Sequence, residues 1–202
     1  MKVGAKRWRG IAILEFTLSS VFLVPLLLGV LVFGFRLIRS IEMMQITRDL
    51  GHMYLRGVNF TNPGPQQNAQ TLASGFNLTA TGTSLVILSE LKVIQQSDCD
   101  AANIAPPGKP CANLNLPVFM QQITVGNTSC GVSPFGTPPT TNGSVGIVDQ
   151  AQNPLAVATN FSSVLVIPAG VIAYMAEMIN LTPDLNVPGF SGKPLVYARS
   201  IF

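Results

Sequence analysis

A single carboxylate follows a glycine at a distance of five residues, between a basic leader and a long apolar run. The leader, residues 1–10, contains four Lys and Arg residues and ends in Gly10, and Glu15 is the only charged residue between positions 11 and 35. A carboxylate that enters the apolar layer of a membrane is costly unless it is paired, so it is a functional candidate by default. The chemistry expected at Glu15 is therefore ion pairing at a membrane.

The apolar run is long enough to cross a bilayer. Phe16 to Phe35 is a stretch of 20 uncharged residues, and at about 1.5 Å per residue it spans roughly 30 Å, the thickness of the hydrocarbon core. The positive leader predicts a cytoplasmic amino terminus, since translocating its charges is unfavourable. A cleaved secretory signal has a shorter core that ends in a small-x-small site, which Val32–Arg36 does not offer. An uncleaved signal anchor explains the charges and the length, but it gives no reason for Glu15.

Helical structure is expected from Ile11 to about Val58. Pro25 lies inside the apolar run and predicts a bend or local melting near residues 21–25. Beyond the membrane the apolar stripe moves to another side of the helix, which indicates packing on the protein's own head. The residues Asn62-Pro63-Gly64-Pro65 are expected to end the helix. The second stripe consists of Met43, Ile46, Leu50, Met53 and Tyr54.

Residues 59–202 are expected to form a small, loop-rich head dominated by antiparallel strands. The strongest strand patterns are Ser84–Gln96 and Val118–Val125, which suggest an antiparallel pair with a long connection. Residues 131–143, with several Pro, Thr and Gly, are expected to be an irregular loop. Together with the amino-terminal helix, this predicts an α+β fold. Weaker candidates are strands at Ser144–Asp149, Ser163–Ile167 and Leu195–Phe202, and a short helix at Ala169–Asn180.

Three cysteines, Cys99, Cys111 and Cys130, lie in the head without the C-x-x-C spacing of a zinc or redox site. One disulfide is expected, with Cys99–Cys111 as the first choice and Cys130 left over. Cys111–Cys130 is the next choice, and three free thiols remain an alternative, because sequence alone does not fix the pairing.

The composition argues against nucleic-acid binding and against catalysis. The formal net charge is +3, but without the leader 8 Lys and Arg stand against 9 Asp and Glu, so no basic patch is left for nucleic acid. The one histidine, His52, has no cysteine or carboxylate ligands placed around it, and Asp98 and Asp100 are a weak calcium candidate. We expect no enzyme activity and no cofactor or metal. Asn-x-Ser/Thr triplets occur at Asn59, Asn77 and Asn127, among others.

The amino-terminal segment resembles the class III signal sequence of type IV pilins and pseudopilins, in which a prepilin peptidase cuts after the glycine and the fifth residue of the mature chain is glutamate. Here Gly10 is followed by Ile-Ala-Ile-Leu-Glu-Phe at positions 11–16. More narrowly, the segment is similar to the TadE-like proteins of tight-adherence (Tad, Flp-type) pilus systems. The resemblance covers about 50 residues and is carried by Arg9, Gly10, Ala12, Glu15, Phe16, Pro25, Leu26–Gly29, Phe33 and Gly34.

The resemblance implies a pilin-like fold and a processed membrane precursor. It implies cleavage between Gly10 and Ile11 by a prepilin peptidase, storage in the bacterial inner membrane with the head outside the cytoplasm, and assembly by an ATPase and a platform protein. Glu15, Phe16 and Pro25 are the implied assembly residues. Cleavage would leave a positive α-amine on Ile11, and Glu15 of the same or a neighbouring subunit is the nearest counter-ion.

Three functional hypotheses follow. The first is a TadE-like minor pilin or pseudopilin that initiates, caps or decorates an adhesive filament, with copies of itself or other pilins as partners. The second is the main filament subunit, although the head is larger than that of the very short major pilins of Tad systems, and Ile11 stands where many pilins have Phe. The third, from another class, is an uncleaved, signal-anchored periplasmic binding or adhesion domain that never polymerises.

Overall fold

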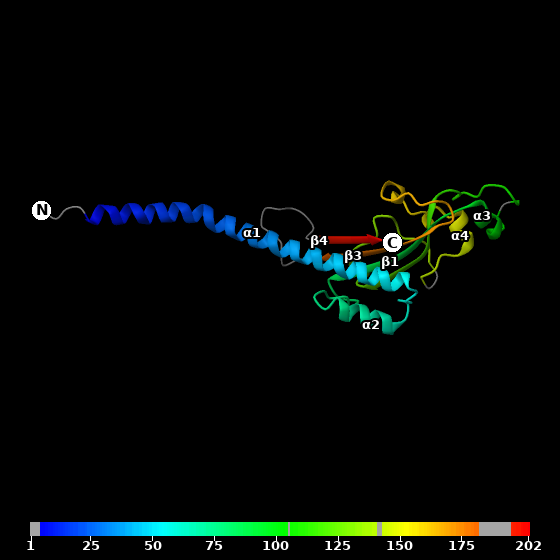
Figure 1. Ribbon diagram of the computed structural model, residues 1–202, viewed down its shortest axis with the longest axis horizontal. Helices are drawn as coiled ribbons and strands as arrows, with labels where there is room; N and C mark the ends of the chain where they lie inside the picture. Colours follow the sequence, from blue (N-terminus) through cyan, green and yellow to red (C-terminus); the bar gives the residue numbers. More distant parts are fainter. Residues whose placement is uncertain (1–4, 105, 141–142, 182–194) are drawn as a thin grey trace. The chain divides into compact units, whose positions relative to one another are not determined.

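The structure is a computed structural model that describes residues 5–104, 106–140, 143–181 and 195–202, with the backbone alone for residues 5–11. The chain divides into two compact units, residues 1–41 and residues 42–202. The boundary falls inside one helix, α1 (Ala5–Leu55), so this element contributes to both units (Figure 1).

The first unit consists of α1 alone in the described part of the chain. The helix begins at Ala5, so residues 5–10 of the leader are helical. It also continues without a break through Pro25, so the predicted local melting does not occur. A proline inside a helix removes one backbone hydrogen bond, here the one to the Val21 carbonyl, and the turns on both sides keep their own bonds. By length and composition, α1 can cross a membrane.

The helix ends at Leu55, three residues before the predicted end, because of a glycine that the sequence reading did not use. Gly57 has a φ of 83°, a left-handed conformation that costs glycine little. The Gly57 N–H donates to the Tyr54 carbonyl and the Val58 N–H donates to the Met53 carbonyl, which is the Schellman pattern of helix ends. The proline-rich residues that were expected to end α1 instead begin α2 (Pro63–Leu72), because proline fits the first helical position.

The second unit is built on a four-stranded antiparallel sheet with the order β2-β1-β3-β4. The central pair is β1 (Ser84–Val93) and β3 (Ile172–Leu181), and the edges are β2 (Pro117–Gly126) and β4 (Leu195–Ile201). Two of the predicted strand patterns are β1 and β2, which pair antiparallel with a bulge between Glu90 and Leu91. The predicted strand Leu195–Phe202 is also confirmed, since β4 (Leu195–Ile201) pairs with β3 along its length.

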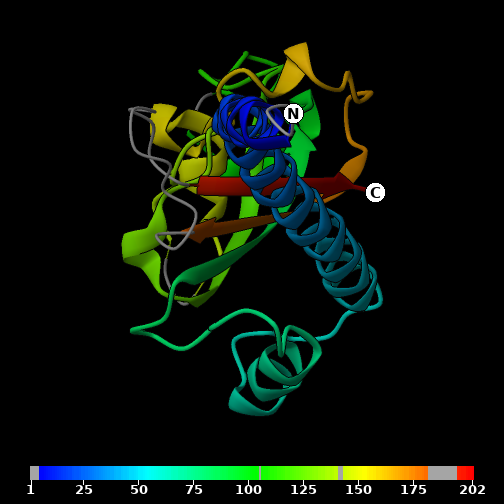
Figure 2. The same cartoon turned by 90° about the vertical axis from the view of Figure 1, so that its left-hand side faces the viewer.

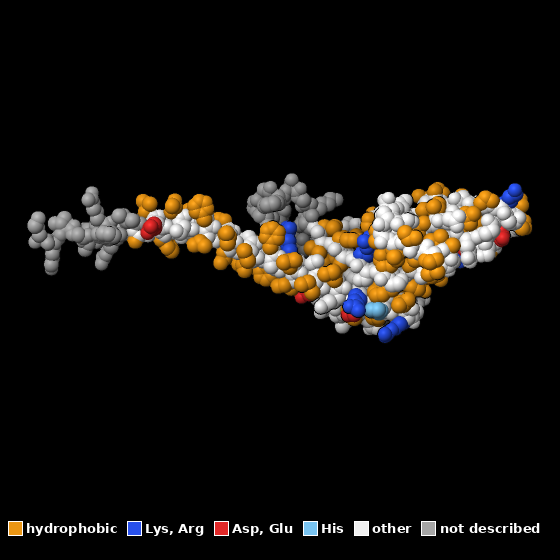
Figure 3. All heavy atoms as spheres, turned by 45° about the horizontal axis from the view of Figure 1, so that its top comes forward, with side chains coloured by type: hydrophobic (Ala, Val, Ile, Leu, Met, Phe, Trp, Pro, Cys, Tyr) orange, Lys and Arg blue, Asp and Glu red, His pale blue; other side chains and the backbone are white. Residues whose placement is uncertain are grey.

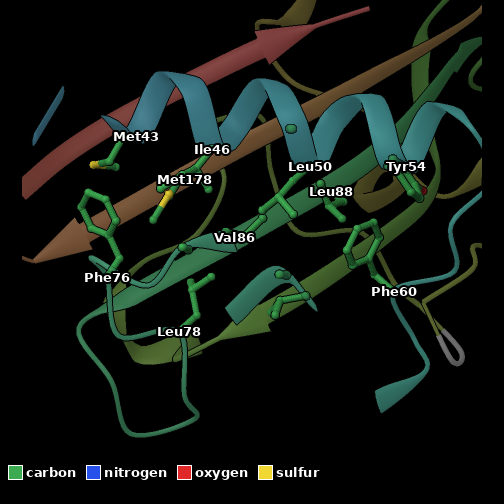
Figure 4. Packing of buried hydrophobic residues seen from close by; sticks show 14 of the residues in the cluster. Met43, Ile46, Leu50, Tyr54, Phe60, Phe76, Leu78, Val86, Leu88 and Met178 are labelled. Carbon is green, nitrogen blue, oxygen red and sulfur yellow. The ribbon is translucent and has the colours of Figure 1, made fainter. Parts of the chain in front are cut away.

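One face of the sheet packs on the later part of α1, residues 42–55. Met43, Leu50 and Tyr54 of the helix are buried against this face (Figure 4). These residues belong to the stripe that the sequence pattern assigned to the head. Side chains from all four strands complete this cluster, with α2 packed beside it at the bottom of Figure 2. The strand residues are Val86, Leu88, Ile123, Val125, Ala176, Met178 and Ala198.

The other face is covered by the long connection between β2 and β3. Phe135, Val145 and Phe161 of this connection pack with Phe119 and Met175 of the sheet. The connection contains α4 (Ile147–Gln152) and three short 3-10 segments, Thr128–Cys130, Pro154–Ala156 and Phe161–Ser163. The sheet is therefore the middle layer of the head, with helix on one side and loops on the other.

Three of the weaker secondary-structure predictions are wrong. The predicted helix Ala169–Asn180 is largely β3, and the predicted strands Ser144–Asp149 and Ser163–Ile167 are mostly helix and irregular chain. In β3, eight consecutive positions from Ala173 to Asn180 are buried or half-buried, because it is a central strand covered on both faces. A short apolar run of this kind has no alternation that separates strand from buried helix.

Candidate functional site

Glu15 lies on α1 with its side chain exposed. Ile11 is four positions earlier in the same helix, so the two residues share one side, about one turn apart. The backbone geometry therefore suits a pair between the Glu15 carboxylate and an α-amine on Ile11. In the described part of the chain the one ion pair is Lys92–Asp98, so Glu15 has no intramolecular counter-ion there.

Thr17 and Ser20, two of the three hydroxyl residues that follow Glu15 in the apolar run, bond the backbone of their own helix. Thr17 donates to the carbonyls of Ile13 and Leu14 at 3.0 and 2.9 Å. Ser20 donates to the Phe16 carbonyl at 2.8 Å. A hydroxyl that bonds its own backbone can enter lipid at low cost, whereas an unpaired carboxylate cannot. Glu15 is therefore the costliest side chain in this segment to place in lipid without a partner.

Phe16 and Pro25 lie on opposite sides of α1, because nine residues at 3.6 residues per turn correspond to two and a half turns. The Phe16 ring is 73% exposed. On the side of α1 away from Pro25, an entirely apolar shallow hollow of about 430 Å³ runs along the helix. It is lined by Leu23, Val24, Leu26, Leu27, Val30 and Leu31. This surface can contact lipid or another apolar helix, and it offers no reactive group.

Cys99 and Cys111 form a disulfide, with their Cα atoms 5.4 Å apart. This is the pair that the sequence reading placed first. Cys99 lies in α3 (Gln96–Ala102), whose start is fixed by a capping box between Gln95 and Asp98. Cys130 is free and buried, and burial raises the pKa of its thiol. Because disulfides persist in oxidising compartments, the ring indicates that the head is extracytoplasmic.

Asp98 and Asp100 organise the local chain and do not face a common ligand. Asp98 accepts hydrogen bonds from Lys92 at 2.6 Å and from the Gln95 N–H at 3.0 Å. Asp100 accepts from the Gly108 N–H and the Gln96 amide, and these bonds, the one from Gly108 first, lower its pKa. In the described ranges no group of three His, Cys, Asp or Glu side chains could hold a metal ion. The weak calcium hypothesis gains no support.

His52 packs on an aromatic ring. Its ring centre lies 4.5 Å from that of Phe202, whose side chain also covers Gly51. Next to it, a shallow hollow of about 330 Å³ has Asp49, Met53, Arg56 and Leu72 as its other lining residues.

The Asn-x-Ser/Thr triplets have a structural explanation. The side-chain carbonyl of Asn59 accepts bonds from the N–H and hydroxyl of Thr61. Asn77 makes the same two contacts with Thr79. Asn127 accepts from the Ser129 N–H at 2.9 Å. These are Asx turns, in which asparagine closes a turn with its own side chain. These three triplets therefore mark loop corners of the head.

Sequence reasoning missed Glu177, a fully buried carboxyl on β3. The Tyr197 hydroxyl donates to its Oε1 at 2.5 Å. Arg199 lies opposite Glu177 on β4, and its guanidinium sits 5.1 Å from the centre of the Phe135 ring. Burial raises the pKa of Glu177, while hydrogen bonds from Tyr197 and Ser133 and the charge of Arg199 act in the opposite direction. The sequence signal for this buried carboxyl was a single acidic residue inside the mostly apolar run 169–180.

No protein-family model, curated protein or solved structure matches this chain. The class is therefore defined by architecture: a long apolar amino-terminal helix whose later part packs on a four-stranded antiparallel sheet. This is a pilin-like architecture with a helix capable of spanning a membrane. The helix indicates a membrane anchor or signal, and the disulfide indicates an extracytoplasmic head.

Proposed function

We propose that this chain is a structural subunit of a TadE-like, Tad-type pilus that is cleaved after Gly10 and assembled as a minor pilin or pseudopilin. The observation that carries the proposal is one carboxylate, Glu15, on an apolar helix that can span a membrane and continues into the core of an exported head. The role is structural and not enzymatic. The partners are a prepilin peptidase, other pilin subunits, and the platform protein and ATPase of the assembly machinery.

Cleavage at Gly10 is the first step that can be tested. In a host with the peptidase, mass spectrometry of the extracted protein should find a chain that begins at Ile11. Gly10→Val should keep the leader attached, because a pocket that admits only hydrogen at this position would exclude the larger side chain. Gly34→Val is the matched control, since nothing lies within 4 Å of a side chain at Gly34, and it should be processed normally. A wild-type chain that retains Met1 would favour the uncleaved, signal-anchored domain.

Assembly is proposed to depend on the pair between the Ile11 amine and Glu15. Two opposite charges buried together cost much less than either charge alone. Where the Ile11 amine of one subunit pairs with Glu15 of a neighbouring subunit, the pair favours one axial offset between their helices. Glu15→Gln should leave cleavage intact and strongly reduce the amount of the protein in sheared filaments. Thr17→Val removes a polar group that bonds only its own helix, and this control should assemble normally. Normal piliation with Glu15→Gln would contradict the proposed pair.

The head favours a minor role over the main filament subunit. Together with the part of α1 packed on it, the head forms the compact unit 42–202, which is large beside the very short major pilins of the systems that the amino terminus resembles. Quantifying the protein in sheared surface material distinguishes the two roles. A minor subunit should form a small fraction of the filament protein, whereas the major subunit should dominate it.

A further inference from the structure

The two edges of the sheet are treated differently by the rest of the head. At the β2 edge, residues of the connection between β2 and β3 complete the backbone hydrogen bonds of β2. Gln122 donates to the Gly143 carbonyl at 2.8 Å, and the Met120 carbonyl accepts from the Val145 N–H at 2.9 Å. The Pro117 carbonyl accepts from Ala158 further along. The chain itself therefore closes the β2 edge.

The β4 edge is not closed by any residue that the structure describes. Tyr174 and Phe202 exchange both backbone bonds, at 3.0 and 2.8 Å. In an antiparallel ladder the pairs alternate, so every second residue of the edge strand points its N–H and C=O away from its neighbour. No backbone bond joins these outward groups to another described residue. The outward residues are Leu195, Tyr197, Arg199 and Ile201.

The β4 edge has few of the features that keep edge strands apart. Natural edges are usually short, bulged, interrupted by proline, covered by another segment, or marked with charged side chains, above all lysine; the one charged side chain of β4 is Arg199. β4 is seven residues long, contains neither proline nor lysine, and keeps an unbroken register with β3. Leu195 and Tyr197 are 41% and 36% exposed. A regular edge with exposed apolar side chains is a template for another strand.

We propose that β4 pairs antiparallel with β4 of a second copy of this chain. The two four-stranded sheets then become one continuous sheet around a two-fold axis at Ala198. The proposal depends only on the head and holds whatever the fate of the leader.

The charge on β4 selects this register. Centred on Ala198, the pairing sets Leu195 against Ile201 of the second copy and Tyr197 against Arg199, so all four outward residues are matched. Moving the centre to Arg199 places two guanidinium groups directly opposite each other, which is destabilising. Moving it to Tyr197 places Ile201 beyond the first residue of β4 in the second copy. The sequence of β4 is therefore self-complementary in one register.

The two-fold axis sets the relation between the two chains. It stands perpendicular to the sheet, so it reverses every direction that lies along the sheet. Residues 42–55 of α1, which pack on the sheet, run in opposite directions in the two copies. The pairing therefore suits two chains whose heads approach each other in opposite orientations. It differs from the parallel, side-by-side packing of apolar helices.

Cysteine cross-linking of the full chain in detergent tests this register. Mixing the Leu195→Cys and Ile201→Cys proteins under mild oxidation should give a disulfide-linked species of twice the 21.5 kDa monomer mass. Val132→Cys is the control, because Val132 is 68% exposed and lies outside β4. Mixed with Ile201→Cys, it should give little product. Equal cross-linking with the control would overturn the proposal.

Association without cross-linking provides the second measurement. Analytical ultracentrifugation of the wild-type chain should show a dimer that forms with increasing concentration. Leu195→Pro removes an outward N–H at the first residue of the strand, where proline is tolerated. It should weaken dimerisation roughly tenfold or more, with an unchanged circular dichroism spectrum. A wild-type chain that stays monomeric refutes self-pairing, and this result is expected if the edge binds a strand of another protein. A dimer that Leu195→Pro does not weaken also refutes it.

Discussion

The two parts of α1 contain similar apolar residues in opposite surroundings. Before the unit boundary, Leu28 and Phe33 are 55% and 67% exposed, whereas Met43 and Leu50 after it are fully buried. Between Phe16 and Phe35 this first part has no charged residue and exposes large apolar side chains, as in a helix that faces lipid or other helices. In the second part Met43, Ile46 and Leu50 are buried, whereas Gln45, Arg48 and Asp49 are exposed. Figure 3 shows charged side chains next to the histidine on the surface of the head. One continuous helix thus has two surroundings. The chain itself covers only the second part, through the packing of the head on residues 42–55.

The strongest test of this contrast is the same substitution in both parts. Leu50→Ala should lower the free energy of unfolding by about 2–5 kcal/mol, because it leaves a cavity between α1 and the sheet. Leu28→Ala changes an exposed side chain in the first part and should leave the head unaffected. Denaturant unfolding of the full chain in detergent, followed by the fluorescence of the head's tyrosines, measures both. Similar losses for the two variants would contradict the contrast.

The disulfide lies in the second unit only, so its removal should affect the two units differently. Replacing Cys99 and Cys111 by Ser opens a ring whose ends are 12 residues apart, and this should cost the head about 3 kcal/mol. The helical circular dichroism signal of the apolar part should be unchanged. Cys130→Ser is the control, because it removes a thiol outside the ring. An equal effect of the control would show that burial and not the ring is responsible.

A glycine in the second part of α1 sharpens the contrast further. A Cβ on Gly51 would lie 2.2 Å from the Phe202 ring, so Gly51→Ala should displace this ring and cost about 1–3 kcal/mol. Gly34→Ala has open space in the first part and should be neutral or slightly favourable to the helix. Thermal unfolding distinguishes them, and a neutral Gly51→Ala would mean that Phe202 does not hold the helix.

The smallest expected effect concerns pH and the other face of the sheet. Because the pKa of Glu177 is raised in the folded head, the folded state binds its proton more tightly than the unfolded chain does. Its contribution to stability is greatest below the unfolded pKa and is lost as pH rises through the folded pKa. Glu177→Gln should therefore raise the melting temperature at neutral pH and reduce its dependence on pH. Glu42→Gln, on the exposed side of α1, controls for the loss of one charge.

Features that depend on neighbouring residues were accessible from the sequence. The apolar run, the stripe through Met43 and Leu50, and the strands β1 and β2 all follow from local periodicity. The exact end of α1 was accessible too, since Gly57 fits the left-handed position that closes a helix.

Features that depend on distant residues were not. β3 was taken for a helix because its two covers, α1 and the connection after β2, are formed by distant parts of the chain. Glu177 became notable only when β4 brought Tyr197 and Arg199 beside it. The candidate site at Glu15 rests on local spacing, which is why the sequence alone could point to it.

The strand order has a consequence for the time at which the head can fold. β1 lies beside β3 in the centre of the sheet, yet paired residues such as Leu88 and Ala176 are almost 90 positions apart. Closing so long a loop is slow compared with forming a helix. During synthesis α1 emerges before the head, and β3 (Ile172–Leu181) follows only after most of the head. The helix is therefore complete long before the head. The head stays unfolded, and so can be translocated across a membrane, until β3 has been synthesised.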